Sequence, residues 1–195
     1  MAIAWIMTIY TLNFNYLSYK STRNSLIHKI TRKINLSDET CPLVTIQLPI
    51  YNEKYVATRL INAVCSMDYP KERMEIQVLD DSDDETCGII EAIVDKYGKD
   101  GFTISAFHRV NRSGYKAGAL KEGLKLAKGE FIAIFDADFI PQSDFLKKAL
   151  CYFEDSKIGL VQGRWGHINE KYSILTKAQA VSLDLHFFIE QKAKS

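Results

Sequence analysis

Apolar and polar segments alternate along most of the chain in the lengths expected of strands and helices. From Cys41 onward, short apolar runs recur between longer segments whose apolar residues follow helical spacing. This alternation predicts an α/β fold with a parallel sheet built from βαβ units. Strands are predicted near residues 43–48, 75–79, 102–107, 131–135 and 158–162, and helices near residues 55–67, 86–97, 116–128, 144–153 and 172–194.

The first nineteen residues, MAIAWIMTIYTLNFNYLSY, are largely apolar and rich in aromatic residues but include Thr8, Thr11, Asn13 and Asn15. A membrane-spanning helix needs about 20 apolar residues, and aromatic residues followed by basic ones are typical of a span that enters the cytoplasm. No basic residue precedes the apolar stretch, which disfavours a signal peptide. Residues 1–37 are therefore predicted to be a membrane-anchoring helix with a basic juxtamembrane segment, and residues 38–195 one domain. An amphipathic surface helix or a core helix is the alternative.

The charge of the chain is unevenly distributed. Five of the 25 basic residues lie in residues 1–37, which hold no acid, so the body keeps 20 basic against 24 acidic residues. A mildly acidic body argues against a nucleic-acid partner. The four cysteines are widely spaced without a C-x-x-C motif, which predicts reduced thiols in the cytosol rather than a zinc site or a disulfide framework. They are Cys41, Cys65, Cys87 and Cys151.

The most informative segment, FIAIFDAD at residues 131–138, is an apolar run that ends on Asp136 and Asp138. It predicts a buried strand, and residues two apart on a strand point the same way, about 7 Å apart. Both carboxylates are thus placed to bind one divalent cation, and carboxylate oxygens suit Mg²⁺ or Mn²⁺. Because Mg²⁺ fills its other positions with water and substrate phosphates, the pair predicts a phosphate-bearing ligand. The alternative is a solvated turn.

Two further predicted strands end in unusual residues. The first is stopped by Pro49 and followed by the loop residues Tyr51, Asn52 and Glu53, while the second ends on Asp80 and Asp81. Ligands of open parallel sheets bind beyond the carboxyl ends of the strands, so these residues are site candidates. Carboxylates at one edge repel each other, and a divalent cation or ligand donors would offset this repulsion.

The acidic run that follows is interpreted differently. Asp83, Asp84 and Glu85 stand where an acidic N-cap and first helical turn belong, and they are predicted to complement the helix dipole.

The segment HRVNRSGYKAGALKEGLKLAKG, residues 108–129, places a basic residue at a helix start. Its glycines do not match G-x-G-x-x-G, and the chain has no G-x-x-x-x-G-K-[ST] motif, so neither dinucleotide nor P-loop binding is supported. Ser113 is predicted to cap the helix. Lys116 in the first turn opposes the helix dipole, and a nearby phosphate would relieve that conflict. The alternative is a solvated surface lysine.

Taken in order, the motifs PIYNE, LDDS, RSGYKAGAL, FDAD and VQGRWGHIN closely resemble membrane-bound glycosyltransferases of family 2, related to cellulose and mannan synthases. The resemblance runs from about residue 43 to the end of the chain. It implies a GT-A fold, a Rossmann-like and mostly parallel sheet with flanking helices that binds a nucleotide-sugar. By the same resemblance, the PIYNE loop and the Asp80/Asp81 pair would hold the base and ribose, Lys116 would approach the diphosphate, and Asp136 with Asp138 would ligate the metal.

The chain departs from the family pattern after the metal motif. The catalytic-base motif Thr-Glu-Asp is absent, and the segment QGRW at 162–165 has the wrong spacing for the family's Gln-x-x-Arg-Trp. The resemblance therefore implies a C-terminally incomplete domain whose base lies outside these 195 residues. Arg164 and Trp165 are kept as candidates for the sugar site, because Trp offers a flat apolar face to a pyranose ring. Their alternative is a core tryptophan beside a surface arginine.

The resemblance implies an inverting, metal-dependent transfer of a sugar from a UDP- or GDP-sugar to a growing polysaccharide or lipid acceptor. The chain would carry the donor-binding part, on the cytoplasmic side of the cell membrane. Two alternatives stay open: a non-catalytic nucleotide-sugar binding fragment, and a phosphotransferase of the haloacid dehalogenase type, which also uses Asp-x-Asp at a strand end. If these residues did catalyse transfer, the candidate bases would be Glu170, Asp184 and Glu190. His167 and His186 are interpreted as structural.

Overall fold

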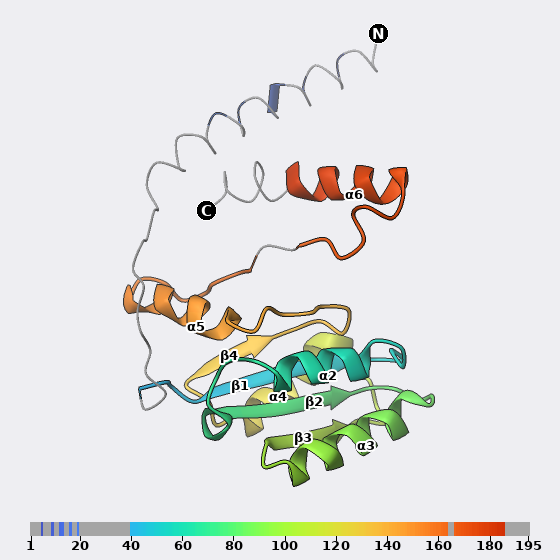
Figure 1. Cartoon of the computed structure of the whole chain (residues 1–195), viewed down its shortest axis with the longest axis vertical. Coiled ribbons are helices and arrows are strands. Elements are labelled where there is room, and N and C mark those ends of the chain that lie inside the picture. The colour runs from blue at the N-terminus through green and yellow to red at the C-terminus, as the bar shows by residue number, and fades with distance from the viewer. Residues whose placement is uncertain are drawn as a thin grey trace. The chain divides into compact units, whose positions relative to one another are not determined.

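The computed structural model describes residues 40–163 and 166–185, together with Trp5, Ile9, Leu12, Asn13, Tyr16 and Tyr19. The chain divides into two compact units, residues 33–157 and residues 1–32 with 158–195. The first unit contains the sheet with its helices, and the second contains α6 (Ile174–Leu185). Figure 1 labels these elements.

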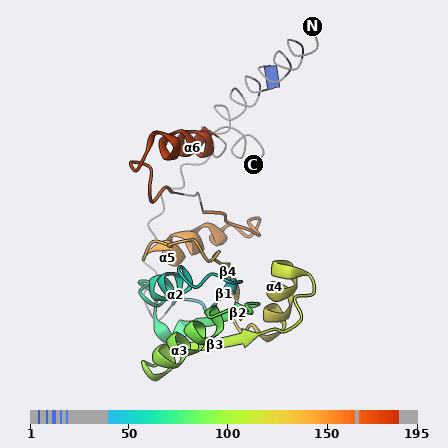
Figure 2. The same ribbon diagram turned by 90° about the vertical axis from the view of Figure 1, so that its right-hand side faces the viewer.

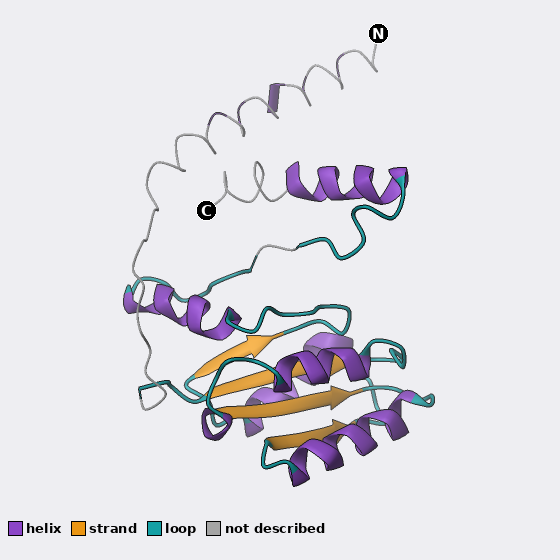
Figure 3. Ribbon diagram, viewed as in Figure 1, coloured by secondary structure: helices purple, strands orange, loops and turns teal. Residues whose placement is uncertain are grey.

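A four-stranded parallel sheet with the order β3-β2-β1-β4 forms the centre of the first unit (Figures 1 and 3). The chain moves outward from β1 to β2 and β3, and then crosses back so that β4 pairs with the other side of β1. Such a reversal is the switch point at which open parallel sheets bind ligands. The strands are β1 (Val44–Ile50), β2 (Met74–Asp80), β3 (Thr103–His108) and β4 (Phe131–Ile134).

One face of the sheet is apolar and is covered by two helices. Alternate residues of β1 and β2 point to this face, and α2 (Ala57–Cys65) and α3 (Thr86–Lys99) bury their own apolar stripes in the same core. Figure 2 shows both helices on one side of the sheet. Each large apolar side chain buried here contributes about 1.5–3 kcal/mol of stability. The strand residues are Val44, Ile46 and Leu48 of β1 with Met74, Ile76 and Val78 of β2.

The opposite face of the same strands is polar, and α4 (Tyr115–Leu126) lies on that side of the sheet in Figure 2. Thr45 donates to Glu75 at 2.6 Å and Gln47 donates to Gln77 at 3.0 Å, all four side chains being buried. Such pairing satisfies polar groups that would otherwise be costly to bury. A Cβ at Gly123 of α4 would lie 2.7 Å from Gln47, so α4 approaches this layer only because position 123 lacks a side chain.

Most elements predicted from the sequence are present with shifted ends, but three expectations are wrong. Residues 158–162 form no strand, and the Leu160 side chain is 82% exposed. Apolar composition does not make a strand where no neighbouring strand offers hydrogen bonds. β4 is not the buried strand that was predicted: it is an edge strand that pairs with β1, and its Ile132 and Ile134 side chains are 37% and 48% exposed.

The third concerns the helix predicted at 144–153, which splits into α5 (Phe145–Leu150) and a 3-10 turn η2 (Cys151–Glu154). A second 3-10 turn, η1 (Lys71–Arg73), leads into β2.

The predicted membrane anchor, residues 1–37, lies almost entirely outside the described residues. Among the residues that the structure does describe, no helix is long and apolar enough to cross a membrane. Arg164, Trp165, His186 and Glu190 also lie outside the described part of the chain.

Candidate functional site

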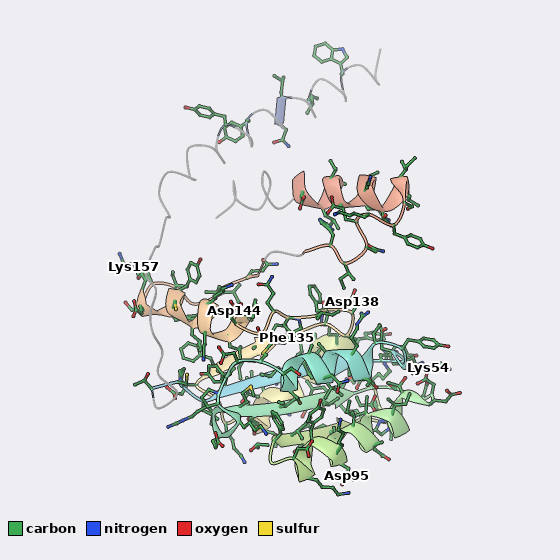
Figure 4. All side chains as sticks on the ribbon, in the orientation of Figure 1. Lys54, Asp95, Phe135, Asp138, Asp144 and Lys157 are labelled. Atoms are coloured by element: carbon green, nitrogen blue, oxygen red, sulfur yellow. The ribbon has the colours of Figure 1, made fainter. Side chains whose placement is uncertain are left out.

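A cleft of about 320 Å³ opens at the carboxyl ends of the strands, beside the switch point between β1 and β4. The strands and loops that form it are separated by up to ninety residues of sequence. In Figure 4, Asp138 and Lys54 lie at the edge of the sheet toward which the strand arrows point. Of the residues predicted for the site, the cleft is lined by Pro49, Tyr51, Glu53, Asp81, Lys116, Asp136 and Asp138.

A second hollow, of about 400 Å³, lies between the end of β3 and α4 and is lined by residues such as Phe107, Gly123 and Leu126. It contains none of the predicted metal or nucleotide residues, so the smaller cleft is the better candidate site.

The two carboxylates of the metal motif lie in a turn rather than on a strand. β4 ends at Ile134, and the Phe139 N–H donates to the Asp136 carbonyl at 3.0 Å. The Asp138 side chain is exposed, and its backbone carbonyl accepts a 3.3 Å hydrogen bond from Arg59. The strand geometry assumed from the sequence therefore does not apply, although both residues line the same cleft.

Lys116 and Asp136 form a hydrogen-bonded ion pair across the cleft. The two side chains are 52% and 41% exposed, so solvent reaches both. Lys116 occupies the first turn of α4, where the helix dipole disfavours a cation. The Asp136 carboxylate offsets that conflict within the chain, without a bound phosphate.

Asp81 is held by two arginines that sequence reasoning missed. Its carboxylate is 4% exposed and receives two hydrogen bonds from Arg109, from Nε at 2.7 Å and from Nη2 at 2.6 Å. Arg112 Nε lies 3.9 Å from the same carboxylate. The hydrogen bond with Asp81 raises the pKa of Arg109 above its ordinary value. The two arginines of the segment HRVNRSGYK, residues 108–116, were the available signal.

Arg112 also covers the aromatic ring of Tyr51. Its guanidinium carbon lies 3.2 Å from the ring centroid, the arrangement of a stacked cation–π pair. The buried Nε of Arg112 has no hydrogen-bond partner within the described structure. A stacked arginine that lines a cleft offers a planar cationic surface to a ligand.

The loop that carries these arginines turns through a left-handed backbone. Gly114 has φ 72° and occupies the N-cap position of α4, so the predicted cap by Ser113 is wrong. Tyr115 has φ 49°, which is rare for a bulky residue. The Ser113 carbonyl instead accepts from Arg109 at 3.3 Å. A Cβ on Gly118 would lie 2.0 Å from that carbonyl oxygen, so the loop packs directly on the helix backbone.

Asp80 and Asn52 do not line the cleft. Asp80 lies on the opposite face of the sheet, where its carboxylate accepts from the Ser82 N–H and contacts His108. Asn52 exchanges two hydrogen bonds with Asp83, so this acidic residue joins two loops rather than starting a helix.

The neighbouring acidic residues behave partly as predicted. The Asp84 carboxylate accepts from the Thr86 N–H at 2.8 Å, which is the expected role of an acid at a helix start. Hydrogen bonds with Thr86 lower the pKa of Asp84. Glu85 instead pairs with Lys54, and that hydrogen bond raises the pKa of Lys54.

The second unit contains the other candidate residues that the structure describes. His167 Nε2 lies 3.3 Å from the Asp184 carboxylate of α6, which agrees with the interpretation of His167 as structural. Glu170 is exposed in the turn before α6.

Residues 45–194 match the family model described as Glycosyl transferase family 2. The chain belongs to this family. It is 45% identical over 159 residues to Glucomannan 4-beta-mannosyltransferase 1 of Cyamopsis tetragonoloba, an alignment that covers 79% of this chain and 30% of that protein. It is 42% identical over 167 residues to Glucomannan 4-beta-mannosyltransferase 9 of Arabidopsis thaliana, covering 83% of this chain and 31% of the relative. The family 2 chain thus spans about three tenths of the length of these curated relatives.

Solved structures give the same fold. The mannosyltransferase PcManGT from Pyrobaculum calidifontis, in complex with GDP-Man and Mn²⁺, superposes with a TM-score of 0.66 at 27% identity, over 81% of this chain and 45% of that one. TarS residues 1–349 of S. aureus, in complex with UDP, gives a TM-score of 0.51 at 26% identity over 63% and 39% of the two chains. The family 2 chain therefore has the GT-A-like α/β fold, a parallel sheet with flanking helices.

Proposed function

We propose that this chain is the donor-binding part of a metal-dependent, inverting glycosyltransferase that forms a β-linkage on a glycan or lipid acceptor. The observation that carries the proposal is the composition of the cleft. One side presents Asp136, Asp138 and Lys116, and the other presents Asp81 with the stacked Arg112 and Tyr51. Carboxylates and a lysine suit a metal-bound diphosphate, whereas a planar stack beside a carboxylate suits a nucleoside.

The residues present fit a hard divalent cation, because both donors are carboxylates at an open turn. A cation bound by Asp136 and Asp138 would stabilise the charge that develops on the departing nucleoside diphosphate. If Asp136 bound such an ion, the ammonium group of Lys116, which now pairs with Asp136, would be available to the phosphates. Lys116 and Arg112 would then hold the donor, and Asp81 would orient Arg112 through their ion pair.

We take a GDP-sugar as the donor to test first, with mannose as the sugar and UDP-sugars as the comparison. Curated relatives are glucomannan mannosyltransferases and one structural neighbour is a mannosyltransferase that holds GDP-Man. Family membership leaves no support for a haloacid dehalogenase-type phosphotransferase. A non-catalytic binding role stays the second candidate, because each carboxylate that lines the described cleft, namely Glu53, Asp81, Asp136 and Asp138, is already proposed to hold the nucleotide or the metal.

Calorimetry tests the metal site directly. The purified chain should bind GDP at least about tenfold more tightly with Mn²⁺ or Mg²⁺ than with chelator, and Asp138→Asn should remove that difference. The matched control is Asp95→Asn on α3, where Asp95 is exposed and paired with Lys99. Equal affinity with and without metal, in wild type and variant alike, would remove Asp136 and Asp138 from the site.

Transfer is tested separately from binding. We expect the purified 195-residue chain to bind donor with metal and to transfer no sugar, since general-base catalysis typically contributes about 10² to 10⁴-fold. Glycan synthesis by this chain, free of other transferases, would show that one of its own carboxylates, with Glu170, Asp184 and Glu190 the candidates, acts as the base.

We also propose that residues 1–37 attach the domain to the cytoplasmic side of the cell membrane through an apolar helix. The chain should then sediment with vesicles and resist extraction with high salt, because salt screens a basic patch but not apolar burial. Removing residues 1–19 should make the attachment salt-sensitive. Release of the intact chain by salt alone would contradict the proposal.

A further inference from the structure

Three side chains with different donor atoms converge on the α3 face of the sheet, away from the cleft. Asp80 ends β2, His108 ends β3 and Cys87 lies in the first turn of α3. The register pairs Asp80 directly with His108, and side chains paired in this way point to the same face. Because α3 follows β2, its first turn brings the Cys87 thiol to the same point. One ligand atom from each residue lies within 4.8 Å of the other two.

The contacts exclude a nucleophilic relay. Asp80 Oδ2 lies 3.1 Å and Cys87 Sγ lies 3.9 Å from the same ring nitrogen, Nδ1 of His108. In a Cys–His–Asp relay the carboxylate and the thiol hold opposite nitrogens of the ring. Three donors that face one another around one point are instead the arrangement that a metal ion needs.

The donor types favour one metal, and the distances are compatible with it. Tetrahedral Zn²⁺ with ordinary bond lengths places N and O ligands about 3.4 Å apart, and S and N ligands about 3.6 Å apart. The observed 3.1 and 3.9 Å differ from these by a few tenths of an ångström. A thiol with an imidazole and a single carboxylate suits Zn²⁺, whereas Mg²⁺ and Mn²⁺ favour oxygen ligands. The His108 side chain is 45% exposed, which gives the ion an entry path and leaves a fourth position for water.

We propose that Asp80, Cys87 and His108 form a Zn²⁺ site, distinct from the Asp136/Asp138 pair and independent of the proposed function. The ion would join the ends of β2 and β3 to the start of α3. The residues that follow in sequence, Asp81 and Arg109, form an ion pair, and Asp81 lines the cleft. Zn²⁺ would therefore fix the distance between the ends of β2 and β3, which Asp81 and Arg109 directly follow.

Cobalt substitution tests the site, because Co²⁺ bound to a thiolate absorbs in the near ultraviolet. The metal-free 195-residue chain should show this band on titration with Co²⁺ and lose it when Zn²⁺ is added. Cys87→Ser should abolish the band, whereas Cys151→Ser, which changes another partly buried thiol, should keep it. Zn²⁺ should raise the Tm of wild type and leave that of Cys87→Ser unchanged.

His108→Gln is the second variant, because His108 ends an edge strand and its replacement should leave the fold intact. It should weaken Co²⁺ binding at least about tenfold with an unchanged circular dichroism spectrum. Asp138→Asn should keep the thiolate band, which separates this site from the cleft. Absence of the band in wild type, or its survival in Cys87→Ser, would overturn the proposal, and so would full Co²⁺ affinity in a folded His108→Gln.

Discussion

Two pairs of aspartates lie at the carboxyl ends of β2 and β4, two strands of the same sheet, but their environments are opposite. Asp80 and Asp81 at the end of β2 are both buried, and each has hydrogen-bonded partners within the chain. Asp136 and Asp138 after β4 are half-buried and exposed. Buried charges must be paired to be tolerated, whereas exposed carboxylates keep their hydration and stay available to a ligand. The first pair is therefore held in place by the fold, whereas the second pair keeps carboxylate oxygens accessible to a ligand.

The largest effect is expected from a substitution that removes the partner of a buried aspartate, Asp81. Arg109→Ala leaves Asp81 buried without its bidentate partner, and removing one member of a buried pair is strongly destabilising. Since the Arg109 side chain is 17% exposed, we expect the lower end of the usual range, a loss of about 3 kcal/mol in the free energy of unfolding. Urea denaturation measures it.

Asp136→Asn is the matched change at the open pair. Its partner Lys116 is solvated, so we expect a change within about 0.5 kcal/mol. Equal losses in the two variants would show that burial does not distinguish the pairs.

Part of this difference was readable in the sequence. Alternation along MEIQVLD assigns Asp80 to the same face as Met74, Ile76 and Val78, and hence away from the cleft. Because side chains alternate between the two faces along a strand, the same pattern assigns Asp81, the next residue, to the opposite face of the sheet. The LDDS motif led to the same predicted role for both residues, because a motif gives the order of residues and not the face of the sheet on which each side chain lies.

The partners of Asp81 were beyond the sequence, for a physical reason. Arg109 and Arg112 lie in a loop whose path depends on the left-handed backbone at Gly114 and on the close packing of Ser113 against Gly118. Glycines suggest that a turn exists, but a set of long-range contacts decides which way it carries an arginine. The strand expected at 158–162 is absent for the same kind of reason. A strand needs a second segment to pair with, whereas the apolar pattern describes only one segment.

The next largest effect disturbs that loop without touching any charge. Gly118→Ala places a methyl group 2.0 Å from the Ser113 carbonyl oxygen, so backbone must move. We expect a loss of about 2 kcal/mol in the free energy of unfolding, together with weaker nucleotide binding because Arg112 is displaced.

Gly88→Ala in α3 is the matched control. No atom lies within 4 Å of a Cβ at Gly88, and the higher helix propensity of Ala should stabilise the chain by about 0.5–1 kcal/mol. A neutral Gly118→Ala in urea denaturation would contradict the role given to the loop.

A smaller effect separates binding from stability at the open pair. Lys116→Gln removes the cation that Asp136 pairs with in this structure and that the diphosphate would use. We expect about tenfold weaker binding of GDP with Mn²⁺, the usual worth of a hydrogen bond to a charged group, with a stability change within about 0.5 kcal/mol. Calorimetry and urea denaturation on one preparation measure both. Unchanged affinity would remove Lys116 from the phosphate site.

The smallest expected effect concerns Asp84, which is exposed like Asp138 but has a hydrogen-bonded partner in the chain like Asp81. Hydrogen bonds with Thr86 lower its pKa, so the folded chain releases this proton more readily than the unfolded chain does. The contribution to stability is therefore present above the unfolded pKa and is lost as pH falls through the lower folded pKa. Asp84→Asn should be slightly less stable than wild type in urea at neutral pH, and this deficit should shrink as the pH falls below the ordinary Asp pKa and the carboxyl group gains its proton. A deficit that persists unchanged in acid would assign the effect to the shape of the side chain at the start of α3 rather than to its charge.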